Sequence, residues 1–137
     1  MRPNNVLYRK CTKESIFRDW LTFLEPFHRM TNREMDVAAR ILRQYFILKD
    51  KIDDLAVLQE VLWTPKSRKD MMASLCMTSA HFQIQLDHLR KKGFLKDDNA
   101  IEPRYLPHLS EEPRFHLLVV FDMSTPKRPL RDEPKQD

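Results

Sequence analysis

The sequence predicts an α+β fold that is mostly helical, with one compact domain between two extended arms. Two observations lead to this prediction. Apolar residues recur at helical spacing from residue 12 to residue 92, and the period changes after Gly93, the single glycine among 137 residues. A third observation sets the boundaries: residues 1–12 are mostly polar and basic and residues 123–137 are rich in proline, which leaves 13–122 for the domain.

Two helices are predicted in the first part of this domain. Thr12 can cap a helix that ends near Leu24, because Pro26 limits its continuation. The second helix begins with Thr31-Asn-Arg-Glu34, a capping box in which each of the two side chains accepts a hydrogen bond from the other residue's backbone N–H. It is expected to end near Lys49. The predicted buried faces hold Ile16, Trp20, Phe23 and Leu24 in the first helix, and Met35, Ala38, Ile41, Leu42, Tyr45 and Phe46 in the second.

Three further helices follow, separated by short turns. The first covers Ile52 to Leu62. The next begins at Pro65 after a threonine cap and ends near Cys76, and the last, capped by Thr78, covers Ser79 to Lys92. Gly93 then stands where helices commonly end in a left-handed residue. The side chains expected to face the core are Leu55, Leu58, Val61 and Leu62, then Met72 and Leu75, then Phe82, Leu86 and Leu89.

After Gly93 the pattern favours β-structure. Phe94-Leu95 and Ala100-Ile101 flank a polar turn and predict a small hairpin, and the apolar run Phe115 to Phe121 predicts a buried strand. Residues 102–114 contain three prolines and are expected to form a loop. Two helices a few residues apart, followed by a hairpin, have the order of a winged helix-turn-helix. The predicted fold is therefore a winged helix-turn-helix with a small β-wing and a C-terminal strand.

Several motifs extend the comparison beyond this general order. Pro26-Phe27 leads into Met30-Thr-Asn-Arg-Glu34, Leu86-Asp-His-Leu-Arg-Lys-Lys-Gly-Phe-Leu95 closes the last helix, and Ile101-Glu-Pro-Arg104 precedes the terminal strand. With these motifs, over roughly residues 20–122, the chain resembles a group of small proteins of the crAss-like phages, tailed phages that infect Bacteroidetes. The resemblance implies a phage protein with a winged-helix body and does not name a function.

The net charge of +4 belongs to the N-terminal arm. Residues 1–13 contain no acidic residue, residues 14–122 carry 16 basic and 17 acidic side chains, and residues 123–137 have a net charge of +1. The domain is therefore almost neutral, and the arm is the best candidate for a partner-binding element. Its positive charges are Arg2, Arg9, Lys10 and Lys13.

In a winged-helix regulator, the second helix of the pair would read DNA. This helix has no lysine or arginine before Arg90, and Asp87 and the acidic hairpin tip at 97–98 oppose a polyanion. A DNA-binding transcriptional regulator of a phage is therefore the alternative function. The candidate reading face consists of Ser79, His81, Gln83, Gln85 and His88. The candidate contacts to phosphate or to an acidic surface are Lys66, Arg68, Lys69, Arg90, Lys91 and Lys92.

The sequence lacks the spacings that catalysis and metal binding require. The two cysteines have no C-x-x-C spacing, and the histidines do not form an H-E-x-x-H pattern. One glycine excludes the usual phosphate-binding glycine loops. We therefore expect no enzymatic activity, cofactor, metal site or small-molecule substrate. No stretch is apolar enough for a membrane span, so a membrane partner is not expected either.

The preferred function is a structural subunit of the phage virion. The proline-rich tail suits packing along a neighbour's surface, and the predicted strand at 115–121 can complete a sheet across subunits. We expect a ring or connector subunit of the portal-tail neck that forms a homo-oligomeric ring. Its other partners would be portal, neck or tail proteins, and it would enter the virion after synthesis in the host cytoplasm.

Overall fold

The computed structural model describes residues 7–109, 118 and 120–124. Its contacts divide the chain into two units, Met1–Pro107 and His108–Asp137. The described residues of the second unit form no helix or strand. The described part of the first unit contains six α-helices and one short 3-10 helix. They are α1 (Ile16–Phe23), α2 (Glu25–His28), α3 (Asn32–Lys49), α4 (Leu55–Leu62), α5 (Pro65–Leu75), α6 (Ser79–Lys91) and the 3-10 helix η1 (Pro103–Tyr105).

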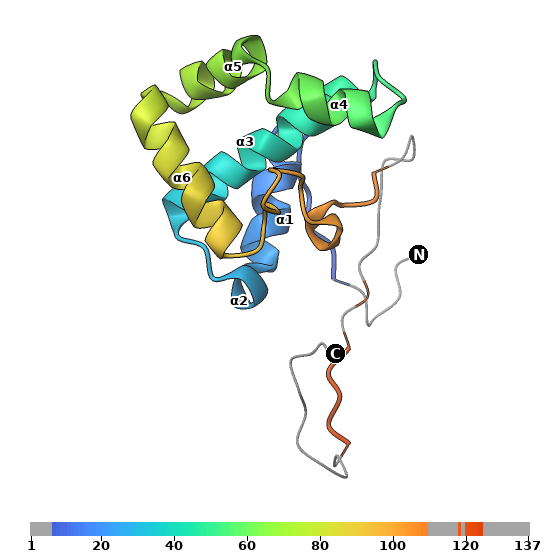
Figure 1. Ribbon diagram of the computed structural model, residues 1–137. Helices are drawn as coiled ribbons and strands as arrows, with labels where there is room; N and C mark the ends of the chain where they lie inside the picture. The colour runs from blue at the N-terminus through green and yellow to red at the C-terminus, as the bar shows by residue number, and fades with distance from the viewer. Residues whose placement is uncertain (1–6, 110–117, 119, 125–137) are drawn as a thin grey trace. The chain divides into compact units, whose positions relative to one another are not determined.

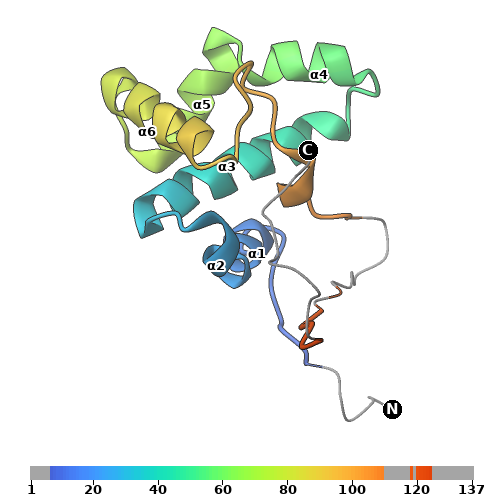
Figure 2. The same ribbon diagram turned by 60° about the horizontal axis from the view of Figure 1, so that its bottom comes forward.

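Helix α3 is the central element of the first unit. Figures 1 and 2 show α1 and α2 on one side of α3, and α4, α5 and α6 on the other. Helix α3 packs against α1, α4, α5 and α6, so the core of the unit lies along it. The side chains with no exposed surface are Leu21, Val37, Ala38, Ile41, Leu42, Leu62, Met71, Leu86, Leu89 and Phe94.

The predicted helix boundaries are confirmed where local capping marks them. Thr31 Oγ1 accepts a hydrogen bond from Glu34 N at 3.2 Å, and Glu34 Oε1 accepts one from Thr31 N at 2.9 Å. This capping box begins α3, which ends at Lys49 as predicted. Threonine hydroxyls cap α5 and α6 as well. Gly93 follows α6 with a φ of +83°, in the left-handed region that favours glycine.

The start of α1 and the role of Pro26 differ from the prediction. Thr12 makes the contacts of the predicted cap, because its Oγ1 accepts from Ser15 N at 3.0 Å and its carbonyl accepts from Ile16 N at 2.9 Å, but residues 13–15 form a turn and α1 itself begins at Ile16. Helix α1 ends at Phe23, next to the predicted end at Leu24, but Pro26 does not prevent a further helix. It stands in the first turn of α2, where the backbone N–H that proline lacks has no helical acceptor.

Tertiary contacts shift the buried faces of several helices. Phe17 and Leu21 are buried in α1, and Met71 is buried in α5. Asp54 caps α4, which begins at Leu55 rather than at Ile52 and leaves Leu55 at its exposed first position. These helices carry apolar residues beside the predicted faces as well as on them, so helical spacing alone does not identify which face is buried. The side chains predicted as buried that are exposed or half-buried are Ile16, Phe23, Tyr45, Phe46, Leu55, Val61, Met72 and Leu75.

The predicted β-wing is absent from the described residues. One antiparallel bridge joins Leu95 to Ile101, and Lys96 N donates to Ala100 O at 2.8 Å across the turn. Glu102 N also donates to Phe94 O at 2.9 Å, but Phe94 N donates to Leu89 O at the end of α6 instead of back across the turn, and η1 begins at Pro103, so the pairing ends there. The carbonyl at the end of η1 accepts a 3.0 Å hydrogen bond from a tryptophan of α1, so the segment packs against the helices instead of projecting as a wing.

The predicted C-terminal strand lies mostly outside the described residues. Within Phe115 to Phe121 only Leu118, Val120 and Phe121 are described, and they belong to no strand. Of the tail at 123–137 only Met123 and Ser124 are described. The winged-helix prediction is therefore wrong for the part of the chain that the structure describes, which is helical, although the α5–α6 helix-turn-helix pair is present.

Candidate functional site

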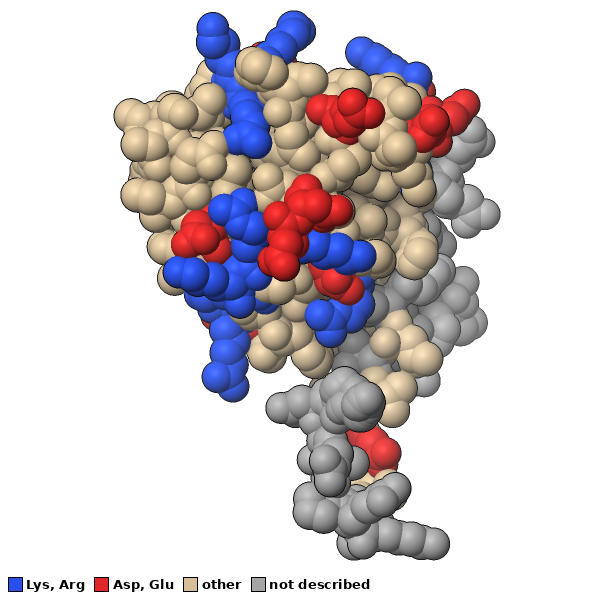
Figure 3. All heavy atoms as spheres, in the orientation of Figure 1, with Lys and Arg blue, Asp and Glu red and all other residues tan. Residues whose placement is uncertain are grey.

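Helix α6, the second helix of the helix-turn-helix pair, presents an uncharged face. Ser79, His81 and Gln83 are exposed, and Ile84 beside them is 54% exposed. Gln85 was expected on this face but is only 7% exposed, because it lies on the side of α6 that faces the core. In Figure 3 the charged side chains gather lower on the molecule, over the C-terminal end of α6, and the surface over the α5–α6 turn lacks them.

Each basic residue at the C-terminal end of α6 lies near an acid of the same chain. Lys91 Nζ is 3.1 Å from Asp87 Oδ2, and Lys92 Nζ is 2.7 Å from Glu34 Oε1. Arg90 Nη2 is 3.8 Å from Asp87 Oδ1. The carboxylates of Asp87 and Glu34 therefore balance two of these three positive charges within the protein, which weakens their use as phosphate contacts.

The basic residues at the start of α5 are arranged differently. The Arg68 guanidinium lies 5.3 Å from the centre of the Trp63 ring and donates a 3.1 Å hydrogen bond to Trp63 O. It therefore packs on the protein surface. Lys66 and Lys69 are exposed, and no ion pair or hydrogen bond holds them in the described part of the chain. They remain available to a partner.

The structure describes only part of the basic N-terminal arm. Arg2 lies outside the described residues. Arg9 Nη2 donates a 2.9 Å hydrogen bond to Asp19 Oδ1, which ties the arm to α1. Lys10 and Lys13 are exposed and make no ion pair with any described residue. In the described part of the arm, the charges of Lys10 and Lys13 are therefore available to a partner.

Glu34 joins the beginning of α3 to the end of α6. Its carboxylate is buried, and it accepts hydrogen bonds from Thr31 N and from Lys92 Nζ. His88 Nδ1 lies 3.0 Å from Glu34 Oε2, without the angle of a hydrogen bond. Burial raises the pKa of Glu34, but the hydrogen bonds from Lys92 and Thr31 and the charges of Lys92 and His88 outweigh it and lower the pKa. His88, predicted for the reading face, thus belongs to a contact between helices.

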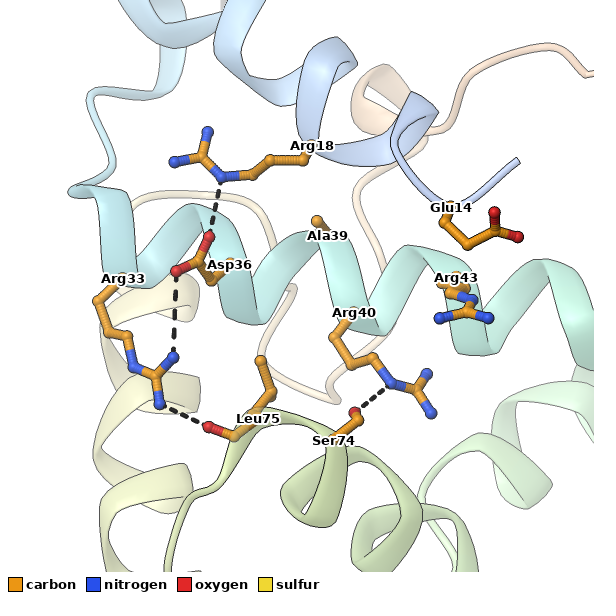
Figure 4. Close-up of a pocket in the computed structure, with 9 residues that line it drawn as sticks. All are labelled: Glu14, Arg18, Arg33, Asp36, Ala39, Arg40, Arg43, Ser74 and Leu75. Carbon is orange, nitrogen blue, oxygen red and sulfur yellow. Dashed lines mark hydrogen bonds and ion pairs between the residues drawn. The ribbon is translucent and has the colours of Figure 1, made fainter. Parts of the chain in front are cut away.

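A hollow of about 370 Å³ lies between α1, α3 and the end of α5. Figure 4 shows Arg18 of α1 on one side of it, and Arg33, Arg40 and Arg43 along α3. Arg18 Nε donates to Asp36 Oδ1 at 2.9 Å, and Arg33 Nη1 lies 4.0 Å from Asp36 Oδ2. One carboxylate therefore serves two of the four guanidinium groups, and the hollow remains positively charged.

Polar side chains of α3 and α5 hold Arg40 in place. Its Nε donates to Ser74 Oγ at 2.6 Å, and its Nη1 donates to Gln44 Oε1 at 2.9 Å. Gln44 is fixed in turn, because its Nε2 donates to Ser67 Oγ at 3.1 Å, and both Gln44 and Ser67 are buried. These contacts fix the orientation of the Arg40 side chain. Both acceptor oxygens are neutral, so the contacts leave the positive charge of Arg40 uncompensated.

The charge of Arg40 is poorly balanced by its surroundings. Burial lowers the pKa of Arg40, the positive charge of Arg43 lowers it further, and Asp70 opposes these effects without reversing them. Arg43 is exposed and makes no hydrogen bond or ion pair among the described residues. Glu14 also lines the hollow and forms no ion pair there. An anion could therefore bind between Arg40 and Arg43.

The sequence alone does not predict this hollow. Its arginines were counted as part of a nearly neutral domain, and Arg18 and Ser74 come from helices remote in sequence. A usable signal was nonetheless present. Arg33, Arg40 and Arg43 recur at helical spacing along the helix predicted for residues 31–49, which places them on one side of it.

Other kinds of site find no support in the described residues. There, no three histidine, cysteine, aspartate or glutamate side chains come together in a way that could hold a metal ion. None of the helices in that part of the chain combines the length and the apolar character of a membrane span. Comparison with protein-family models, curated proteins and solved structures found no match to this chain.

Proposed function

We propose that this protein is a non-enzymatic structural subunit of a phage virion, a ring or connector component of the portal-tail neck that packs against other subunits. The observation that carries this proposal is the uncharged, partly apolar face of α6. The sequence resemblance to proteins of tailed phages is the reason for choosing the virion as the assembly.

The face of α6 suits a protein better than DNA. Binding to DNA depends mainly on lysine and arginine side chains that neutralise phosphates. Ser79, His81, Gln83 and Ile84 supply none, and the basic residues that follow them lie near acids of the chain. Burial of the exposed Ile84 side chain against a partner protein would be favourable, whereas a DNA groove offers it no comparable apolar surface.

Lys66 and Lys69 are the observation that favours the alternative, a DNA-binding regulator. Both lie exposed in the first helix of the helix-turn-helix pair. In proteins of that type the first helix crosses the DNA backbone, so lysines there can contact phosphates. The experiments below therefore include DNA.

The first test is quantitative mass spectrometry of purified phage particles that carry the gene. The proposal expects the protein in every particle preparation, in several copies per particle. Ile84→Asp is expected to reduce its incorporation about tenfold, because a charge replaces an apolar contact. Val57→Asp is the matched control, since Val57 is an exposed apolar residue of α4 with 43% exposure, against 54% for Ile84. A protein absent from particles, or equal losses with both variants, would contradict the proposal.

The second test is an electrophoretic shift assay at physiological salt with phage DNA and micromolar protein. The proposal expects no sequence-specific shift. A specific shift that Gln83→Ala abolishes, combined with absence from particles, would replace the structural function by the regulatory one.

A further inference from the structure

We infer that the hollow between α1, α3 and the end of α5 is a binding site for a carboxylate side chain of a partner protein, which Arg40 and Arg43 hold. This inference rests on the proposed packing function and adds the chemistry of one contact. Four observations support it: the hollow itself, the donors of Arg40 and the Arg43 side chain that have no partner among the described residues, and the modest size of the positive charge.

The donors of Arg40 are already oriented for a ligand. Its Nε and Nη1 are occupied by Ser74 and Gln44, so the two N–H groups of Nη2 have no acceptor among the described residues. Ser67 anchors Gln44 from behind. A guanidinium fixed in this way loses little conformational entropy when it binds, because its rotamer is set before the ligand arrives.

Arg43 adds a second, adaptable set of donors. It lies three residues after Arg40 on the same side of α3, and Figure 4 shows both side chains at the same end of the hollow. The charge of Arg43 lowers the pKa of Arg40, which means that the two charges repel each other. A bound carboxylate would relieve that repulsion and accept charge-assisted hydrogen bonds from both.

The charge of the hollow favours a carboxylate over a phosphate. Asp36 and Glu14 line it together with the four arginines, and the carbonyl of Leu75 at its edge accepts a 2.8 Å hydrogen bond from Arg33. The C-terminal end of a helix such as α5 also carries partial negative charge. The four arginines exceed the two carboxylates by two charges, and the carbonyl and the helix end reduce this excess further, which suits one negative charge better than a dianionic phosphate.

The test uses the full chain and a fluorescent glycine-serine peptide that contains glutamates, with binding measured by fluorescence anisotropy at physiological salt. Wild type is expected to bind the peptide, and Arg43→Gln to weaken it about tenfold through loss of charge-assisted hydrogen bonds. Lys51→Gln is the matched control, because Lys51 is exposed, has no described partner and lies outside the hollow. It is expected to change the affinity less than twofold, as befits a screened surface charge.

Nuclear magnetic resonance locates the site. The Nε–H signal of Arg40 is expected to shift on peptide addition in wild type, and Arg43→Gln is expected to need about ten times more peptide for the same shift. No peptide binding, or equal weakening by Arg43→Gln and Lys51→Gln, would overturn the inference. Inorganic phosphate that shifts the same signal and displaces the peptide at lower concentration would overturn the choice of a carboxylate.

The two proposals can fail separately, because the peptide assay needs no virion partner. If the protein is found in particles and Ile84→Asp impairs its incorporation while the peptide does not bind, only the carboxylate site is refuted. If the peptide binds at Arg43 while the protein is absent from particles, the virion function is refuted and the site is retained as an anion-binding surface.

Discussion

The contact between Glu34 and Lys92 is expected to stabilise the fold measurably, and Glu34→Gln tests it. Glu34 is 5% exposed, and its Oε1 accepts hydrogen bonds of 2.9 Å from Thr31 N and 2.7 Å from Lys92 Nζ. Glutamine has nearly the same size and keeps an oxygen for Thr31. The substitution therefore removes the negative charge while it leaves the capping box in place.

The expected loss is about 1–2 kcal/mol of unfolding free energy, the range for a hydrogen bond to a charged group after partial solvent screening. The lower part of this range applies because the Lys92 side chain is 31% exposed and also donates to Arg29 O at 2.9 Å. Lys92 is thus not left without a partner when Glu34 loses its charge.

The same substitution is expected to change the pH dependence of stability. The pKa of Glu34 is lowered in the folded state, so its carboxylate stabilises the fold above its usual pKa of 4.5, and this contribution is lost as the pH falls through the folded-state value. Wild type should therefore lose more stability than Glu34→Gln when the pH is lowered from neutral to below 4.5.

Urea denaturation followed by circular dichroism measures both effects. Glu60→Gln is the matched control, because Glu60 is an exposed glutamate of α4 without an ion pair among the described residues. It is expected to leave the urea midpoint unchanged. Equal midpoints for Glu34→Gln and Glu60→Gln at neutral pH, or equal acid losses for wild type and Glu34→Gln, would refute the reasoning.

Two further substitutions test other features of the fold. Gln85→Met is expected to raise the free energy of unfolding by about 1 kcal/mol, and with it the urea midpoint, because the buried Oε1 of Gln85 finds no donor among the described residues. A lower midpoint would mean that this oxygen is hydrogen-bonded. Gly93→Ala is expected to cost about 1 kcal/mol from its positive φ alone, since no atom within 4 Å obstructs an added Cβ. Gly93→Asn should cost less, because asparagine tolerates the left-handed region, and thermal unfolding that ranks Ala above Asn in stability would contradict this explanation.

The helix boundaries of this protein were largely predictable from the sequence. The capping box at Thr31, the threonine caps of α5 and α6 and the left-handed Gly93 were all identified in advance. Each depends on hydrogen bonds or backbone angles within a few residues, so the local sequence contains the information needed to predict it.

The hairpin was predicted wrongly because its outcome depends on distant contacts. Local pattern allowed two short strands at 94–95 and 100–101. The chain instead makes one bridge and continues through η1, where Tyr105 O accepts a hydrogen bond from Trp20, 85 residues earlier in the sequence. Two strands of two residues each would gain little free energy from pairing, so the packing of this segment against the helices determines its conformation.

The candidate site depends on tertiary structure still more strongly. Arg40 meets Ser74 across 34 residues, and Lys92 meets Glu34 across 58. A sequence pattern places Arg33, Arg40 and Arg43 on one side of α3, but it does not show that α1 and α5 enclose them. Helix ends and the uncharged face of α6 follow from the local sequence, whereas the hollow forms only when arginines and acids that are distant in sequence come together in the packed structure.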